Sequence, residues 1–138
     1  MVTLLMARTF KTRVFARWAS KVGLEDVALC KAAQEIRQGL LDADLGGSVV
    51  KKRVPLPGKG KRGSVRTLVA TQKGPFCFFM EGFKKNEKDN ISKAELKALQ
   101  EYAALLLALP LDGLNRFVAD GKMQEICHED KGQTKPHS

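Results

Sequence analysis

Residues 49–80 read VVKKRVPLPGKGKRGSVRTLVATQKGPFCFFM, and this stretch decides the fold. Three runs rich in β-branched or aromatic residues, 49–56, 65–71 and 76–80, are typical of β-strands. A glycine-rich loop and a tight turn over 73–75 separate them. Because short connections join antiparallel neighbours, the stretch predicts a three-stranded antiparallel meander. The phenylalanines of its last run are expected in the core rather than as a platform for stacking bases.

The sequence on both sides of this meander predicts helices and further strands. Ser92 and Glu95 form a capping box, in which each side chain can bond the backbone N–H of the other residue, and Pro110 ends the helix that follows. The other predicted elements are a strand over 8–12, helices over 14–19, 24–38 and 111–119, and a strand over 123–127. Residues 1–127 are therefore expected to form one domain, and residues 128–138 a tail without regular structure.

The chain is basic. Its 138 residues include 24 Lys and Arg against 15 Asp and Glu, which gives a formal net charge of +9. A surplus of this size does not determine a fold, but it favours binding to polyanions such as nucleic acid.

Cysteine usage and hydropathy indicate a cytoplasmic protein. Cys30, Cys77 and Cys127 are odd in number and form no CxxC pair, which argues against a disulfide framework and against a zinc site. Cys77 lies in an apolar run and is expected to be a buried thiol. No apolar run approaches the length that spans a membrane. No metal and no cofactor are expected.

Positive charge is concentrated in and around the loop of the first hairpin. Seven cations and no acid lie between Val49 and Arg66, namely Lys51, Lys52, Arg53, Lys59, Lys61, Arg62 and Arg66. The glycines of this loop let the backbone approach a ligand closely, and Lys and Arg bind phosphate. A second patch, residues 84–86, follows the last strand of the meander and is expected to converge with the first. The alternative is a hairpin loop that is polar only because it is solvated, and the second patch disfavours it.

The same residues carry a family resemblance. GKGKRGSVRT at 58–67, FKKNE at 83–87 and NIS at 90–92 resemble the RelE/HigB toxins of the RelE/ParE superfamily, over about 10–126. Ser64 departs from the glycine of many relatives, and Lys84 from a small residue. The resemblance implies an α+β RelE-like domain. In that domain N-terminal helices pack on a small, twisted, mainly antiparallel sheet, with a later helix alongside.

The resemblance also implies an activity and partners. Such a protein is the toxin of a type II toxin–antitoxin system. It cleaves messenger RNA without metal, usually on a translating ribosome, and so inhibits translation. Its partner is an antitoxin with a helix-turn-helix DNA-binding domain, and only the complex of the two proteins binds operator DNA.

RNA cleavage by this chemistry begins with attack of a ribose 2′-OH on the adjacent phosphate. It needs in-line alignment, charge stabilisation and proton transfer. Both histidines lie in the expected tail, and like charges disfavour the protonated form of a crowded lysine, so lysines are the expected acid and base. The predicted catalytic residues are Lys61, Arg66, Lys85 and Arg62. The predicted RNA-binding residues are Lys59, Lys84, Asn86, Lys52 and Arg53. For Lys52 and Arg53 a solvated strand face is an equally good interpretation, and the sequence does not say which lysine is the base.

Two other functions fit the same fold. One is a ParE-type toxin that acts on DNA gyrase, although a protein target does not require a phosphate-binding cluster. The other is a non-catalytic RNA-binding accessory protein, which would bind RNA with a strong salt dependence and leave it intact.

Overall fold

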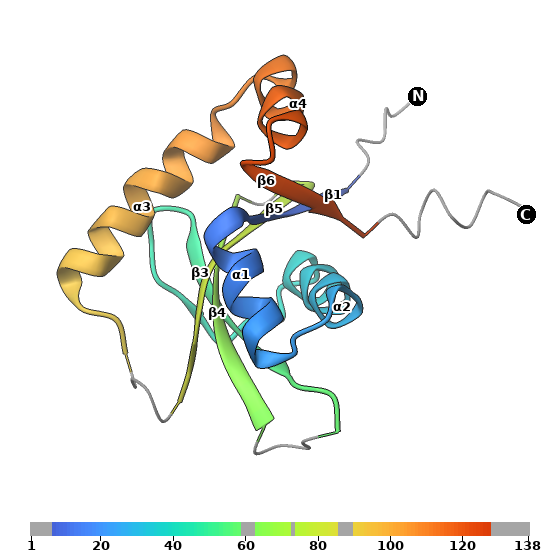
Figure 1. Ribbon diagram of the computed structural model, residues 1–138. Coiled ribbons are helices and arrows are strands. Elements are labelled where there is room, and N and C mark those ends of the chain that lie inside the picture. Colours follow the sequence, from blue (N-terminus) through green and yellow to red (C-terminus); the bar gives the residue numbers. More distant parts are fainter. Residues whose placement is uncertain (1–6, 59–62, 73, 86–89, 128–138) are drawn as a thin grey trace, which may run out of the picture.

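The predicted meander forms the centre of a sheet in the computed structural model, which describes residues 7–58, 63–72, 74–85 and 90–127 (Figure 1). The elements of this part, in chain order, are β1 (Arg8–Thr12), α1 (Arg13–Val22), α2 (Asp26–Arg37), β2 (Ala43–Asp44), β3 (Val49–Pro55), β4 (Ser64–Thr71), β5 (Phe76–Lys84), α3 (Lys93–Leu107), α4 (Leu111–Ala119) and β6 (Met123–Ile126). The fold class is α+β, as the sequence predicts.

The sheet is antiparallel except at one position. Its described strands follow the order β2-β3-β4-β5-β1-β6. The N-terminal strand β1 inserts between β5 and β6. It runs antiparallel to β6 and parallel to β5, which is the one parallel pair among the described strands. The expected meander β3-β4-β5 is confirmed, with a register shift between Leu68 and Val69.

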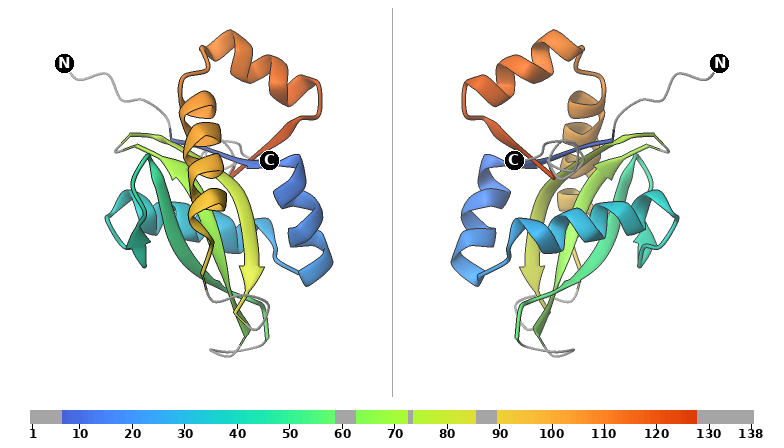
Figure 2. Two further views of the ribbon diagram at one scale, coloured as in Figure 1. Left: turned by 90° about the vertical axis from the view of Figure 1, so that its left-hand side faces the viewer. Right: turned by 90° about the vertical axis from the view of Figure 1, so that its right-hand side faces the viewer.

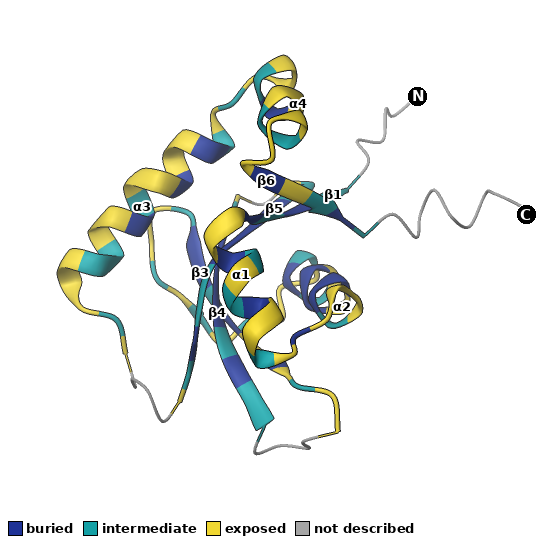
Figure 3. Cartoon of the chain, in the orientation of Figure 1, coloured by how far each residue is buried: buried dark blue, intermediate teal, exposed yellow. Residues whose placement is uncertain are grey.

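Helices cover both faces of this sheet. The two side views show α2 across one face, α3 on the other, and α1 beside β5 (Figure 2). Phe15, Leu29 and Phe79 belong to the core between the sheet and α1 and α2. Phe78 and Leu106 belong to the second core, under α3 and α4. Each such side chain contributes about 1.5–3 kcal/mol by burial, and the central strands between the layers are largely buried (Figure 3).

Local signals set the ends of the helices. The Ser92 hydroxyl accepts the backbone N–H of Glu95, and the Glu95 carboxylate accepts that of Ser92, which confirms the capping box. Thr12 caps α1 in the same way, accepting the backbone N–H of Phe15. Gly23 ends α1 in the left-handed conformation, so this helix extends beyond the predicted 14–19.

The last strand of the meander is also longer than predicted. β5 continues to Lys84, because Glu81 to Lys84 go on pairing with β4. Gly82 interrupts the hydrophobic pattern of the run, and the structure explains why. A Cβ at this position would lie 2.2 Å from Cζ3 of Trp18, so only glycine leaves room for the indole ring.

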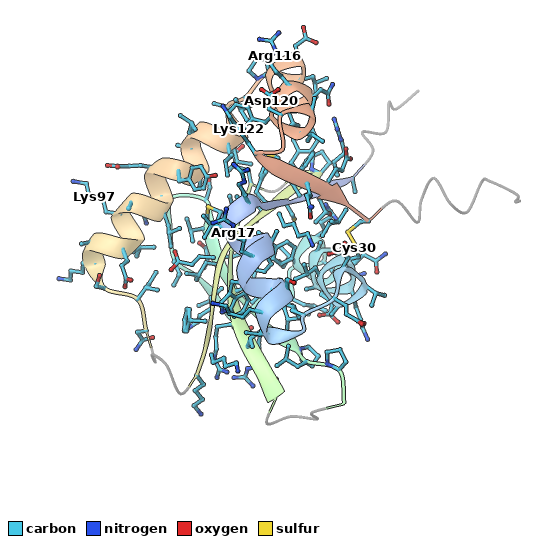
Figure 4. All side chains as sticks on the ribbon, viewed as in Figure 1. Arg17, Cys30, Lys97, Arg116, Asp120 and Lys122 are labelled. Carbon is cyan, nitrogen blue, oxygen red and sulfur yellow. A yellow bond between two sulfur atoms is a disulfide. The ribbon has the colours of Figure 1, made fainter. Side chains whose placement is uncertain are left out.

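One expectation about the cysteines is wrong. Cys30 of α2 and Cys127, which directly follows β6, form a disulfide with their Cα atoms 5.4 Å apart (Figure 4). An odd count and the absence of CxxC could not reveal this pair, because 97 positions separate the two residues and only the fold brings them together. Cys77 is a fully buried thiol, as predicted, and burial raises its pKa.

No single helix in the described ranges is long and apolar enough to cross a membrane. Only α3 and α4 together reach that length, and the chain bends by 109° between them. The predicted tail, 128–138, lies outside the described residues.

Candidate functional site

The two predicted cationic patches flank one end of the sheet. β3 ends and β4 begins there, with Pro55 opposite Ser64, and β5 ends one row short of that pair, with Lys84 opposite Val65. Lys59, Lys61, Arg62 and Asn86, four of the nine predicted site residues, lie outside the described residues. The described part of the site therefore consists of the strand residues that lead into these segments.

A row of three residues crosses the meander near this end. Arg53 on β3 stands directly opposite Arg66 on β4, which in turn stands opposite Phe83 on β5. Directly opposed residues point to the same face of a sheet. Phe83 belongs to the core under α3, so both arginines lie on the α3 face. Phe83 itself is 5% exposed and is a core residue.

The two arginines form an unbalanced pair of positive charges. Arg53 is exposed and Arg66 is half-buried. Neither guanidinium forms an ion pair with a described residue, and the Asp42 carboxylate accepts the backbone N–H of Arg53 rather than a guanidinium N–H. Like charges directly opposite each other destabilise a sheet. An anion between them removes that cost, and guanidinium groups match phosphate oxygens in geometry.

The next row supplies two charged residues that sequence reasoning did not place in the site. Lys51 and Glu81 stand on either side of Leu68, which belongs to the core under α3, so all three point to that face. Glu81 therefore offers a carboxylate on the same face as Arg66. The signal in the sequence was the alternation of β5, since Glu81 lies two residues before Phe83.

Two of the predicted RNA-binding residues lie on the opposite face. Lys52 is nearly buried against α2, where its ammonium group is 2.9 Å from a Glu35 carboxylate oxygen and donates to the carbonyl of Leu40 at 2.8 Å. These bonds give Lys52 a structural role, and we leave it out of the site. Lys84 shares the α1 and α2 face with Val65, its partner on β4.

Lys85 directly follows β5 and is exposed at the end of the sheet. The structure thus brings Arg53 and Arg66 together on one face, places Lys85 at the adjoining strand end, and separates Lys52 from them.

Comparison with known proteins agrees with this architecture. The sequence profile of the family described as "RelE toxin of RelE / RelB toxin-antitoxin system" matches residues 7–126, a span that contains every described helix and strand. No curated protein matches the chain significantly. Because the profile covers most of the 138 residues, the chain belongs to the RelE family of toxins, whose members pair with a cognate antitoxin.

Proposed function

We propose that this RelE-family toxin is an endoribonuclease that cleaves messenger RNA on translating ribosomes and thereby inhibits translation. The observation that carries the proposal is the opposed pair Arg53 and Arg66, which has no carboxylate partner within the described ranges. The pair lies where β3 and β4 meet the loop with Lys59, Lys61 and Arg62. A cluster of this kind binds a phosphate group rather than a neutral substrate.

The proposed chemistry uses side chains alone. A ribose 2′-OH attacks the adjacent phosphate, its proton passes to a base, and the bond to the 5′ oxygen breaks as an acid protonates that oxygen. The products are a 2′,3′-cyclic phosphate and a 5′-OH end. Lys61 and Lys85 act as base and acid. Arg62 and Arg66 stabilise the charge on the phosphorane-like transition state.

Binding and positioning of the RNA fall to the neighbouring residues. Arg53 contacts the same phosphate as Arg66 or the next one, and Lys59 and Lys84 contact phosphates that flank it. Asn86 orients the substrate by hydrogen bonds. Glu81, on the face of Arg66, is an additional candidate base.

The partner in the cell is, in this proposal, an antitoxin with a helix-turn-helix domain. The toxin–antitoxin complex binds operator DNA through the antitoxin, and the toxin acts in the cytoplasm on ribosomes and messenger RNA. The gyrase-directed alternative is less well supported, because a protein target gives no reason for two arginines that have no ion-pair partner among the described residues and lie beside a lysine-rich loop.

A translation extract programmed with one defined messenger RNA tests the activity. We expect new 5′ ends inside the translated frame with the wild-type chain and at least a hundredfold fewer with Arg66→Ala. Arg116→Ala, a change of an exposed arginine on α4, is the matched control and should cleave like wild type. Intact RNA together with inhibited gyrase supercoiling would instead establish the ParE-type function, and intact RNA that is nevertheless bound would establish the accessory protein.

A further inference from the structure

A second set of unpaired cations lies on α1, away from the proposed catalytic residues. Arg13, Arg17 and Lys21 are all exposed, and none of them forms an ion pair with another residue of the described part. The helix RVFARWASKV contains no acidic residue. Its buried residues, Phe15 and Ala19, point to the core, so the cations occupy the outward side.

The spacing of these cations places them in a line along one side of the helix. They stand four residues apart, so they follow one side of the helix at intervals of about 6 Å. Successive phosphates along a single nucleic-acid strand are separated by a distance of the same order. A line of three cations therefore suits a phosphate backbone that runs along the helix axis.

The stripe borders a groove. An open groove of about 820 Å³ is lined by all three cations, by Trp18, and by Gly121 and Gln124 near β6. Its described lining contains no acid. Lys122 extends the positive charge at the upper end, where its carbonyl accepts the backbone N–H of Arg13 at 3.2 Å, and Arg17 and Lys122 appear on the viewer's side in Figure 4.

Trp18, which lines the groove, connects it to the strand that leads to the candidate site. Trp18 packs over Gly82 of β5, and Thr12, just before α1, donates its hydroxyl to the carbonyl of Met80 on the same strand. Lys84 lies two residues beyond Gly82 on that face, which is about 7 Å further along the strand. Lys85 follows at the strand end. The cations of α1 thus lead along the edge of β5 to the end of the sheet that carries Lys85.

We propose that the α1 stripe, Arg13, Arg17 and Lys21, binds the phosphate backbone of the single-stranded RNA that flanks the cleavage position. The inference rests on RNA being the substrate, as proposed above, but not on cleavage. Lys84, on the same face of the sheet as α1 and next to Lys85 at the strand end, joins the two surfaces in this proposal. A protein partner is less favoured, because the regular spacing of the charges along the helix matches a repeating polyanion.

Binding of non-cleavable RNA of two lengths tests the proposal. The probes are fluorescein-labelled 2′-O-methyl oligonucleotides of three and twenty nucleotides, which lack the attacking hydroxyl. The protein is the purified full chain, as wild type and as the variant Arg13→Gln/Arg17→Gln/Lys21→Gln. The control variant Lys31→Gln/Lys93→Gln/Lys97→Gln removes the same charge from exposed positions on α2 and α3.

The α1 variant should bind the trinucleotide like wild type and the 20-mer roughly tenfold or more weakly. Its salt slope for the 20-mer should fall by about 2, the value for three lost phosphate contacts on a single strand. The control variant should keep both values. An unchanged salt slope of the α1 variant would overturn the proposal.

Two further binding measurements on the same variants would reveal a different ligand of the α1 stripe, and either result below would also overturn the proposal. Unchanged 20-mer binding with lost co-sedimentation on small ribosomal subunits would assign the stripe to ribosomal RNA. Unchanged 20-mer binding with lost capture of the antitoxin would assign it to that protein. If the chain is not a nuclease, messenger RNA stays intact in the translation extract while these binding curves are unaffected, so the two proposals fail separately.

Discussion

Arg53 and Arg66 stand directly opposite each other on β3 and β4, with both guanidinium groups on the α3 face and no ion pair to a described residue. In a protein selected only for stability this arrangement is unfavourable, because opposed like charges weaken a pair of strands. We interpret it as a binding device whose cost is relieved when a phosphate lies between the two groups.

Removing one charge should therefore separate stability from function. We expect Arg66→Gln to leave the free energy of unfolding unchanged or to raise it by up to about 0.5 kcal/mol. The melting temperature should accordingly stay the same or rise. RNA binding and cleavage should fall sharply in the same variant. Thermal unfolding and fluorescence anisotropy with a short oligonucleotide measure the two effects. A loss of stability in step with the loss of binding would show that Arg66 is structural.

Adjacent cations of β3 should behave in opposite ways. Lys52→Ala removes the partner of a partly buried carboxylate and of the Leu40 carbonyl, so it should cost about 2 kcal/mol of unfolding free energy. Arg53→Ala, on the exposed face, should cost less than about 0.5 kcal/mol and weaken RNA binding. Urea unfolding of the two variants decides this. Equal stability of both would contradict the structural role given to Lys52.

The close contact between Gly82 and Trp18 predicts how much stability is lost when one methyl group is added at position 82. Gly82→Ala should destabilise the chain by about 1–3 kcal/mol, because the added Cβ overlaps the indole ring. Gly74→Ala, where nothing lies within 4 Å of the added atom, is the control and should be nearly neutral. In a Trp18→Leu background the cost of Gly82→Ala should shrink, and an undiminished cost would place the strain elsewhere.

The disulfide should make stability depend on redox conditions. Closing a loop of 97 positions removes entropy from the unfolded chain, so the oxidised form should be more stable than the reduced form by about 4 kcal/mol. Fluorescence of the single tryptophan during urea unfolding, with and without dithiothreitol, measures the difference. Cys30→Ser should abolish this difference in stability between the oxidised and reduced forms. Cys77 should stay unreactive to iodoacetamide until the chain unfolds, because the thiol is buried and its pKa is raised. An oxidised form no more stable than the reduced one would contradict the cross-link.

The sequence predicted the secondary structure well wherever the signal was local. The meander, the capping box at Ser92 and the terminal strand depend on neighbouring residues, and each is confirmed. The insertion of β1 between β5 and β6 could not be predicted, because it depends on pairing between distant segments. The disulfide was missed for the same reason.

For the candidate site, the composition predicted a concentration of positive charge but not the face of the sheet on which each charged side chain lies. A run of cations such as Lys51, Lys52 and Arg53 looks uniform in the sequence, yet alternation along β3 sends Lys52 to one face and the other two to the opposite face. The direction of this alternation depends on which face α2 and α3 cover. That information lies in the packing and not in the cationic run.

The most direct test of the central claim is to map RNA 5′ ends in cells after induced expression of the chain, with and without Lys61→Ala plus Lys85→Ala. The account predicts growth arrest with new 5′ ends inside translated frames for the wild type, and neither in the double variant. Growth arrest with intact messenger RNA would contradict it, as would cleavage that persists in the double variant.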